Sequence, residues 1–199
     1  MSNEVIIIIA SLLFSAFFSG MEIAYISSNK IHVEIEKKQR GLLARILTKL
    51  TVKPSKFIAT MLIGNNIALV IYGFFMGDLL VNWFQTMLPS SYNIINVLLV
   101  DFNLLTQTII STLLILITAE FLPKVFFQIY SNLLLKVLAV PAYVFYVLFS
   151  FVSDFVIWIS DVVLKQFFKT EGDEVQLAFT KVELGHYISE QMESVEGRD

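Results

Sequence analysis

The sequence VIIIIASLLFSAFFSGMEIAYI, residues 5–26, decides the fold. This stretch reaches the roughly 20 predominantly apolar residues that a helix needs to cross a bilayer. Because peptide groups without hydrogen bonds are costly in lipid, we expect the stretch to be helical. It follows Glu4 instead of a basic region, and its apolar part is longer than the core of a typical signal peptide. We therefore interpret it as the permanent first span of a membrane protein, residues 4–28.

The whole chain shares this apolar character. Of its 199 residues, 56% are hydrophobic and 16% are charged, and the mean hydropathy is +0.74. A soluble domain cannot hide that much apolar surface in one core, so lipid must cover the surplus. The chain has no cysteine, which excludes disulfides, thiolate metal sites and cysteine nucleophiles. Two more apolar stretches, residues 57–83 and 104–122, complete an all-α membrane protein with three predicted transmembrane helices.

The basic residues orient these spans. Eight of the 14 Lys and Arg residues lie between positions 30 and 56, and none lies between positions 57 and 123. By the positive-inside rule, residues 30–56 face the cytoplasm, the 83–103 connection faces outward and the N-terminus lies outside. Apolar residues recur at helical spacing within residues 30–53, which predicts an amphipathic cytoplasmic helix near anionic headgroups. The alternative is a solvated extension of the first span that packs on the rest of the domain.

The apolar stretch 133–168 allows two interpretations, because it is long enough to cross the membrane but has basic residues on both flanks. Pro141 removes a helix donor near its start, and polar residues interrupt it. We therefore favour two helices along the inner interface, or a re-entrant hairpin, over a straight span. These helices join residues 30–53 as juxtamembrane helices of one membrane domain, residues 1–168.

Residues 169–199 form an acidic segment that we expect to be cytosolic and helical. Thr180 followed by Glu183 is a capping box that opens an expected helix through about Gln191. We expect a larger cytosolic part to follow this segment.

Glu22 and Glu120 are the two carboxylates within the predicted spans that we single out. An ionisable side chain there costs about 2.5 to 3.5 kcal/mol on insertion scales, so each is a functional candidate. Glu22 also closes a polar seam along one face of the first span. The seam consists of Ser11, Ser15, Ser19 and Glu22. Close helix packing is the better interpretation for the first two serines, and an ion site is the better one for Ser19, which precedes Gly20.

The second span contains one glycine and two consecutive amides, Gly64, Asn65 and Asn66. Consecutive residues of a helix point in different directions, so one asparagine can face a site while the other ties a neighbouring helix. The sequence leaves open which asparagine does which. Gly73 and Gly77 form a small-xxx-small pattern that suits a contact within the chain or between two copies.

The third span breaks at Pro123. Proline has no N–H, so the carbonyl of Ala119, four residues earlier, loses its helical partner beside Glu120. With Ser19 and an asparagine oxygen, these groups would make an oxygen-only site, which suits Mg²⁺ or Ca²⁺ and argues against zinc or copper. Broken helices commonly line ion sites near the middle of a membrane.

Three stretches in this order resemble the motifs of a known family. Residues 19–24 (SGMEIA), 63–66 (IGNN) and 120–124 (EFLPK) resemble the S-x-x-E-x-A, I-G-N-N and G-E-x-x-P-K motifs of the CNNM/CorC membrane domain. The resemblance covers residues 5–168. It implies a multi-pass homodimer in the plasma or inner membrane that exports Mg²⁺, with Na⁺ as the candidate coupling ion. In the family, paired CBS modules follow the acidic segment and would bind ATP.

The resemblance also implies roles for individual residues. Position 119 is alanine where the family commonly has glycine, which keeps the carbonyl but restricts the backbone. The implied metal ligands are the side chains or backbone oxygens of Ser19, Gly20, Asn66, Ala119 and Glu120. The implied neighbours of the site or of the ion path are Glu22, Ser27, Asn65, Pro123 and Lys124.

Two other classes of function compete with transport. A membrane enzyme is disfavoured, because His32 and His186 lie in the expected cytosolic parts and neither a Ser-His pairing nor an HExxH motif is present. A membrane anchor or regulator of cation homeostasis would not require a buried Glu120 or paired asparagines, so it ranks below transport. We expect the lipid bilayer and a second copy of the chain as partners, and no nucleic acid.

Overall fold

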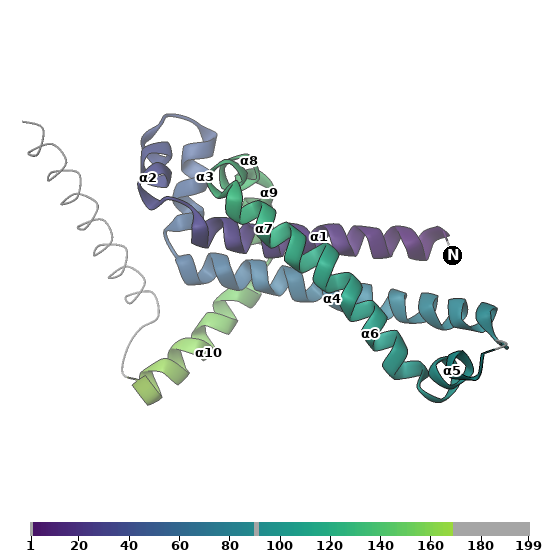
Figure 1. Cartoon of the computed structure of the whole chain (residues 1–199). Coiled ribbons are helices and arrows are strands. Elements are labelled where there is room, and N and C mark those ends of the chain that lie inside the picture. The colour runs from purple at the N-terminus through teal and green to yellow at the C-terminus, as the bar shows by residue number, and fades with distance from the viewer. Residues whose placement is uncertain (1, 90–91, 169–199) are drawn as a thin grey trace, which may run out of the picture. The chain divides into compact units, whose positions relative to one another are not determined.

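The computed structural model describes residues 2–89 and 92–168 of the chain, and the described residues form helices with no strand among them (Figure 1). Three helical segments are long and apolar enough to cross a membrane, and they cover Asn3–Ser27, Pro54–Met87 and Asn103–Ile129. The predicted all-α membrane protein is therefore confirmed, with three candidate transmembrane helices. The helix expected within the acidic segment, residues 169–199, lies outside the described residues.

The chain divides into two units. The first comprises Met1–Ala24 and Met61–Ser131, and the second comprises Tyr25–Thr60 and Asn132–Asp199. Helices α1 and α4 each contribute to both. In chain order the elements are α1 (Ser2–Ser27), α2 (Lys30–Lys38), α3 (Leu42–Thr51), α4 (Pro54–Met87), α5 (Asn93–Asn96), the π-helix η1 (Val97–Asp101), α6 (Asn103–Ile115), the π-helix η2 (Leu116–Phe121), α7 (Leu122–Ile129), α8 (Ser131–Val137), α9 (Ala139–Leu148) and α10 (Ser150–Phe168).

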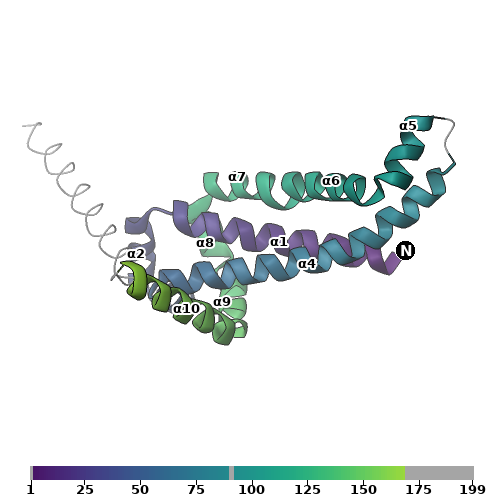
Figure 2. The same ribbon diagram turned by 90° about the horizontal axis from the view of Figure 1, so that it is seen from below.

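In the first unit, α1 and α4 run alongside each other with their chain directions opposed (Figures 1 and 2). Ile8 of α1 lies in a buried cluster with Leu99 of η1 and four residues of one α4 face. Those four are Tyr72, Met76, Leu80 and Phe84. Each of these residues is four positions from the next, which places them along one helix face and explains why α4 buries this side.

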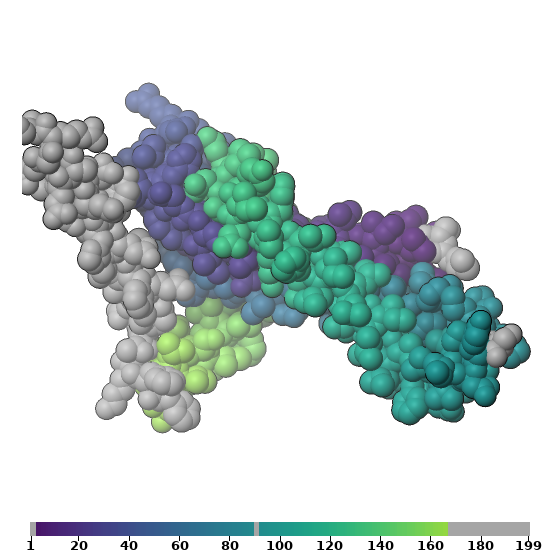
Figure 3. All heavy atoms as spheres, in the orientation of Figure 1, coloured from purple at the N-terminus to yellow at the C-terminus, as the bar shows by residue number. Residues whose placement is uncertain are grey.

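Helix α6 lies largely on the surface of the first unit, where its atoms form a continuous exposed face (Figure 3). Only 6% of the most apolar window of the third span is buried within the chain. An apolar helix of this kind is stable where lipid or protein covers it. The two glycines of the small-xxx-small pattern on α4 have different surroundings. A Cβ atom on Gly77 would lie 2.7 Å from the Gln107 amide nitrogen of α6, whereas a Cβ atom on Gly73 would meet open space.

In the second unit, the single amphipathic helix expected for residues 30–53 is wrong, because two helices, α2 and α3, form there. Asn29 caps the first, and its side-chain oxygen accepts hydrogen bonds from the backbone N–H groups of Ile31 and His32 at 2.9 and 3.1 Å. Gly41 separates the two with φ +142° and ψ 177°, a conformation essentially restricted to glycine. Helix α3 packs on α9 and buries Ala44, Ile46, Leu47 and Leu50.

Residues 133–168 are not one straight helix, as expected. Helices α8 and α9 meet at a bend of 63°, the geometry of a broken span or a re-entrant loop, and α10 follows as a separate helix. Counting the bent pair as one span would raise the number of spans to four. Lys136 of α8 donates a hydrogen bond to Glu36 of α2 at 2.7 Å, which ties α8 to α2. The position of these helices at the inner membrane interface stays a prediction.

Candidate functional site

The polar seam of α1 faces protein in the first unit. Ser11, Ser15 and Ser19 are all buried, with 5% exposure for the first and 0% for the other two. The hydroxyl of Ser15 donates a hydrogen bond to the side-chain oxygen of Asn65 at 2.6 Å. This bond joins α1 to α4, so Ser15 and Asn65 act as the helix tie that one interpretation of the sequence predicted.

One turn further along the seam, the hydroxyl of Ser19 donates a hydrogen bond to the backbone carbonyl of Ala119 at 2.8 Å. Both residues have 0% exposure. Pro123 cannot donate a backbone hydrogen bond to that carbonyl, so the hydroxyl of another span takes up the oxygen that the proline leaves free. The structure thus brings together two of the oxygen atoms that the sequence predicted as ligands.

The carbonyl of Ala119 lies within η2, a π-helix over Leu116–Phe121 that the sequence analysis did not predict. In such a turn the hydrogen bonds skip one residue more than in an α-helix, as when the N–H of Leu122 donates to the carbonyl of Ile117. Single π turns inside α-helices occur frequently at functional sites. Pro123 was the only sequence signal of this irregularity. It predicted the free carbonyl of Ala119, but it did not predict that the neighbouring hydrogen bonds would span five residues instead of four.

Glycines allow close helix packing on both sides of this contact. A Cβ atom on Gly20 would lie 2.5 Å from the ring of Phe127 in α7. A Cβ atom on Gly64 would lie 2.5 Å from the ring of Phe18 in α1. Real side chains almost never approach so closely, so these two positions have a packing reason to be glycine, which for Gly20 adds to its expected role as a backbone ligand.

The remaining predicted ligands do not join the contact between Ser19 and Ala119. Asn66 is exposed on α4, and its amide donates a hydrogen bond to the carbonyl of Leu62 in its own helix at 2.9 Å. Glu120 is half-buried in η2, next to Ala119 in the chain. Within the described residues its carboxylate forms no hydrogen bond or ion pair.

The predicted neighbours of the site are spread over both units. Glu22 is half-buried, one turn beyond Ser19 on α1. Pro123 and Lys124 are half-buried in the first turn of α7. Ser27 is exposed at the end of α1, in the part of that helix that belongs to the second unit.

The groups at this contact are two neutral oxygens, and one acidic side chain is adjacent to them in the sequence. The hydroxyl of Ser19, the carbonyl of Ala119 and the carboxylate of Glu120 are hard donors, which suit a hard cation better than a soft one. Over the described ranges, no group of three or more His, Cys, Asp or Glu residues gathers in a way that could hold a metal ion. A cation here would therefore depend on hydroxyl, amide and backbone oxygens in addition to Glu120.

Comparison with protein families identifies a family for this chain. Residues 6–198 match the family model described as the Cyclin M transmembrane N-terminal domain. This family is associated with Mg²⁺ transport and homeostasis, and its domain is of the transporter type. No curated protein matches the chain.

Proposed function

Because the chain belongs to the family of Cyclin M transmembrane domains, we propose that it transports Mg²⁺ and binds the ion at an oxygen-only site in its first unit. The observation that carries this proposal is the buried contact of 2.8 Å between the Ser19 hydroxyl and the Ala119 carbonyl. The Ala119 carbonyl lies in a π turn that also contains Glu120. The site would be built from α1 and η2, with α4 as the third contributor.

The spacing of the two oxygens is compatible with this choice of ion. Mg²⁺ takes octahedral ligands at about 2.0 to 2.1 Å, so neighbouring ligands are separated by about 3 Å. The Ser19 and Ala119 oxygens are 2.8 Å apart, close to the length of one octahedral edge. Both atoms could therefore ligate one ion with little movement of the backbone, provided that the hydroxyl turns its hydrogen atom away.

Glu120 supplies the negative charge. A carboxylate inside a span is costly unless it has a counter-charge or serves a function, and Glu120 forms no ion pair within the described residues. Mg²⁺ sites in proteins usually combine one or two carboxylates with retained water, so a single glutamate is enough. A bound ion would supply the opposite charge for this carboxylate.

Asn66 and the backbone oxygen of Gly20 complete the proposed ligand set. To act as a ligand, Asn66 would have to leave its hydrogen bond to Leu62. Side chains of exposed residues change rotamer within nanoseconds. Export of Mg²⁺, Na⁺ as the coupling ion, a homodimer and a location in the plasma or inner membrane are further proposals. They are supported by the resemblance of the three motifs alone.

Calorimetry of the purified chain tests the site. We expect the wild type to bind Mg²⁺ at fixed Na⁺, and Glu120→Gln and Asn66→Ala each to weaken binding at least about tenfold, equivalent to about 1.4 kcal/mol. The matched control is Asp78→Asn, because Asp78 is an exposed carboxylate on α4. It lies twelve residues from Asn66, or roughly 18 Å along the helix.

Flux measurements separate transport from anchoring. In proteoliposomes, we expect the wild type and Asp78→Asn to move Mg²⁺ and Glu120→Gln not to do so. If Glu120→Gln binds and moves Mg²⁺ as well as the wild type, the proposed site is wrong. If the wild type moves no Mg²⁺ although it binds the ion, the alternative of a membrane anchor or regulator replaces transport.

A further inference from the structure

The second unit contains a pocket that the proposed transport site does not use. Its volume is about 350 Å³, within the range of roughly 300 to 1,000 Å³ that is usual for small-molecule sites. Helices α3, α4 and α9 contribute to its wall, together with the first residue of α10. The residues that line it are Lys49, Val52, Lys53, Lys56, Tyr143, Tyr146, Val147 and Ser150.

Tyrosines hold two of the three lysines at the pocket wall. The ammonium group of Lys49 donates a hydrogen bond to the Tyr143 hydroxyl at 3.0 Å and lies 5.2 Å from the centre of the same ring. The ammonium group of Lys56 lies 5.4 Å from the centre of the Tyr146 ring. Contacts of this kind between a cation and an aromatic ring are favourable and fix the position of the charge. The pocket therefore holds positioned ammonium groups.

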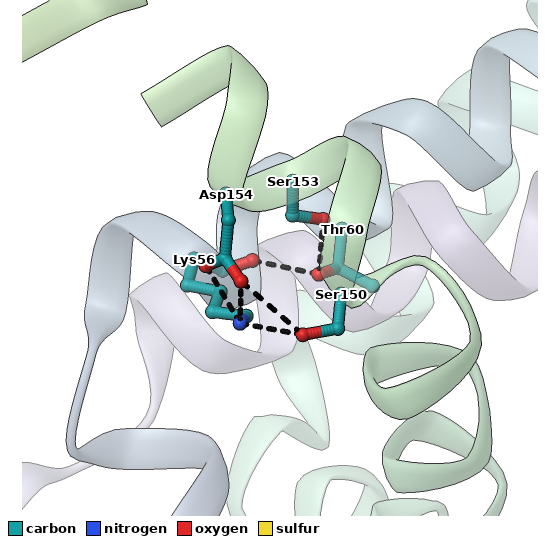
Figure 4. Close-up of polar contacts among 5 residues, drawn as sticks. All are labelled: Lys56, Thr60, Ser150, Ser153 and Asp154. Carbon is teal, nitrogen blue, oxygen red and sulfur yellow. Dashed lines mark hydrogen bonds and ion pairs between the residues drawn. The ribbon is translucent and has the colours of Figure 1, made fainter. Parts of the chain in front are cut away.

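The charge of the pocket is positive. Lys56 is buried, and its ammonium group donates hydrogen bonds to Ser150 and to the Asp154 carboxylate, both at 2.7 Å (Figure 4). Beside them, the hydroxyls of Thr60 and Ser153 lie 2.9 Å apart and join α4 to α10 (Figure 4). Three lysines thus line a pocket whose described lining contains no carboxylate, and Asp154 compensates one of them. The complementary ligand is an anion.

The same pocket has apolar walls that face outward. Val52 and Val147 line it, and they are 62% and 55% exposed. Leu148 and Phe151, which follow Val147 in the chain, are 66% and 84% exposed. In a membrane protein, aliphatic side chains beside a basic pocket suit a ligand that carries acyl chains as well as a charged group. A free phosphate would use the lysines and leave these apolar residues without a role.

We propose that this lysine pocket binds the phosphate of an anionic phospholipid headgroup, with Val52 and Val147 in contact with its acyl chains. The ammonium groups of Lys49, Lys53 and Lys56 would face the phosphate, and the tyrosines would keep them in position. The bound lipid would connect α3 to the junction of α9 and α10. This inference rests on the second unit alone and does not depend on the ion site in the first.

Native mass spectrometry of the full chain in detergent tests the proposal, with phosphatidylglycerol as the probe and phosphatidylcholine as the neutral reference. We expect the wild type to retain phosphatidylglycerol preferentially. Lys49→Gln and Lys53→Gln should each weaken that retention about fivefold, since one lysine near anionic lipid contributes about that factor. The matched control is Lys38→Gln, which removes the same charge from an exposed lysine of α2 that does not line the pocket.

A variant that is expected to bind the lipid more tightly distinguishes a specific effect from simple unfolding, because unfolding could only weaken binding. Asp154→Asn should tighten phosphatidylglycerol binding, because Lys56 loses the carboxylate that competes with the phosphate. The proposal is overturned if Lys49→Gln retains the lipid as well as the wild type, or if Lys38→Gln loses it equally. It is also overturned if millimolar inorganic phosphate displaces the lipid completely, which would assign the pocket to a free phosphate-bearing anion.

Discussion

Ser15 and Ser19 lie one turn apart on the same face of α1, but their hydroxyls bind different helices. Ser15 donates to a side chain of α4, and Ser19 donates to the backbone of η2. Each hydroxyl satisfies a buried oxygen, so each should stabilise the fold by a similar amount. Only the Ser19 contact belongs to the proposed ion site, and stability and ion binding can therefore be separated by comparing the two serines.

We expect Ser15→Ala and Ser19→Ala each to lower the free energy of unfolding by about 1 to 3 kcal/mol, because a buried acceptor is left without its donor. Thermal unfolding of the purified chain measures this loss. We expect only Ser19→Ala to weaken Mg²⁺ binding, by at least about tenfold, as measured by calorimetry. An equal loss of Mg²⁺ affinity in Ser15→Ala would show that the affinity depends on the stability of the fold and not on Ser19 as a ligand.

Two glycines of α4 give a matched pair for packing. In Gly64→Ala the new methyl group would meet the ring of Phe18 at 2.5 Å, and we expect a loss of about 1 to 3 kcal/mol of unfolding free energy. In Gly73→Ala the methyl group would enter open space, and the better helix propensity of alanine should leave stability unchanged or higher by up to about 1 kcal/mol. Thermal unfolding ranks the two variants, and the reverse order would contradict the packing described here.

At the residue scale, the sequence predicted which kinds of contact form better than it predicted which residues form them. It predicted that one of Asn65 and Asn66 ties a neighbouring helix, but consecutive helical residues differ by about 100° in direction. Which of them faces α1 depends on the rotation of α4 about its axis, and no local pattern sets that rotation. The structure identifies Asn65, through its bond to Ser15.

At the scale of elements, we expect the π turn of the third span to depend on Pro123, which follows it by two residues. In Pro123→Ala a backbone N–H returns, which can donate to the Ala119 carbonyl and compete with the Ser19 hydroxyl. We expect the turn to relax toward an α-helix, the Mg²⁺ affinity to fall about tenfold or more, and the thermal stability without Mg²⁺ not to fall. The control is Pro141→Ala in α9, which restores an N–H in the second unit. Unchanged Mg²⁺ affinity in Pro123→Ala would contradict a role of the π turn in binding.

The spans were predictable from the sequence, because lipid accepts only long apolar helices and the chain has three such stretches away from its bent region. The break at Gly41 was not predicted, although residues 36–41 (EKKQRG) interrupt the apolar spacing at this point. The π turn was also missed, since one extra residue in a helix leaves the composition unchanged. Irregular backbone depends on a few hydrogen bonds and not on hydropathy.

At the scale of the whole molecule, the absence of cysteine makes the predicted orientation directly testable. We expect Tyr92→Cys to react with a membrane-impermeant maleimide in intact cells, because the 83–103 connection should face outward. Lys38→Cys should react only after the membrane is permeabilised, because the basic segment should face the cytoplasm. The parent chain gives the labelling background. Labelling of Lys38→Cys in intact cells would contradict the predicted orientation of the first two spans.

The bond between Ser19 and Ala119 also bears on how the proposed transporter would avoid leakage. A single hydrogen atom links the first span to the third at this point. A cation between the two oxygens would repel that hydrogen atom and take its place as the bridge, so the two spans would be held together in both forms. The helices would then have no need to separate when the ion departs. Replacing a hydrogen bond by a metal bridge in this way would let the unloaded form of the proposed transporter keep its first and third spans in contact.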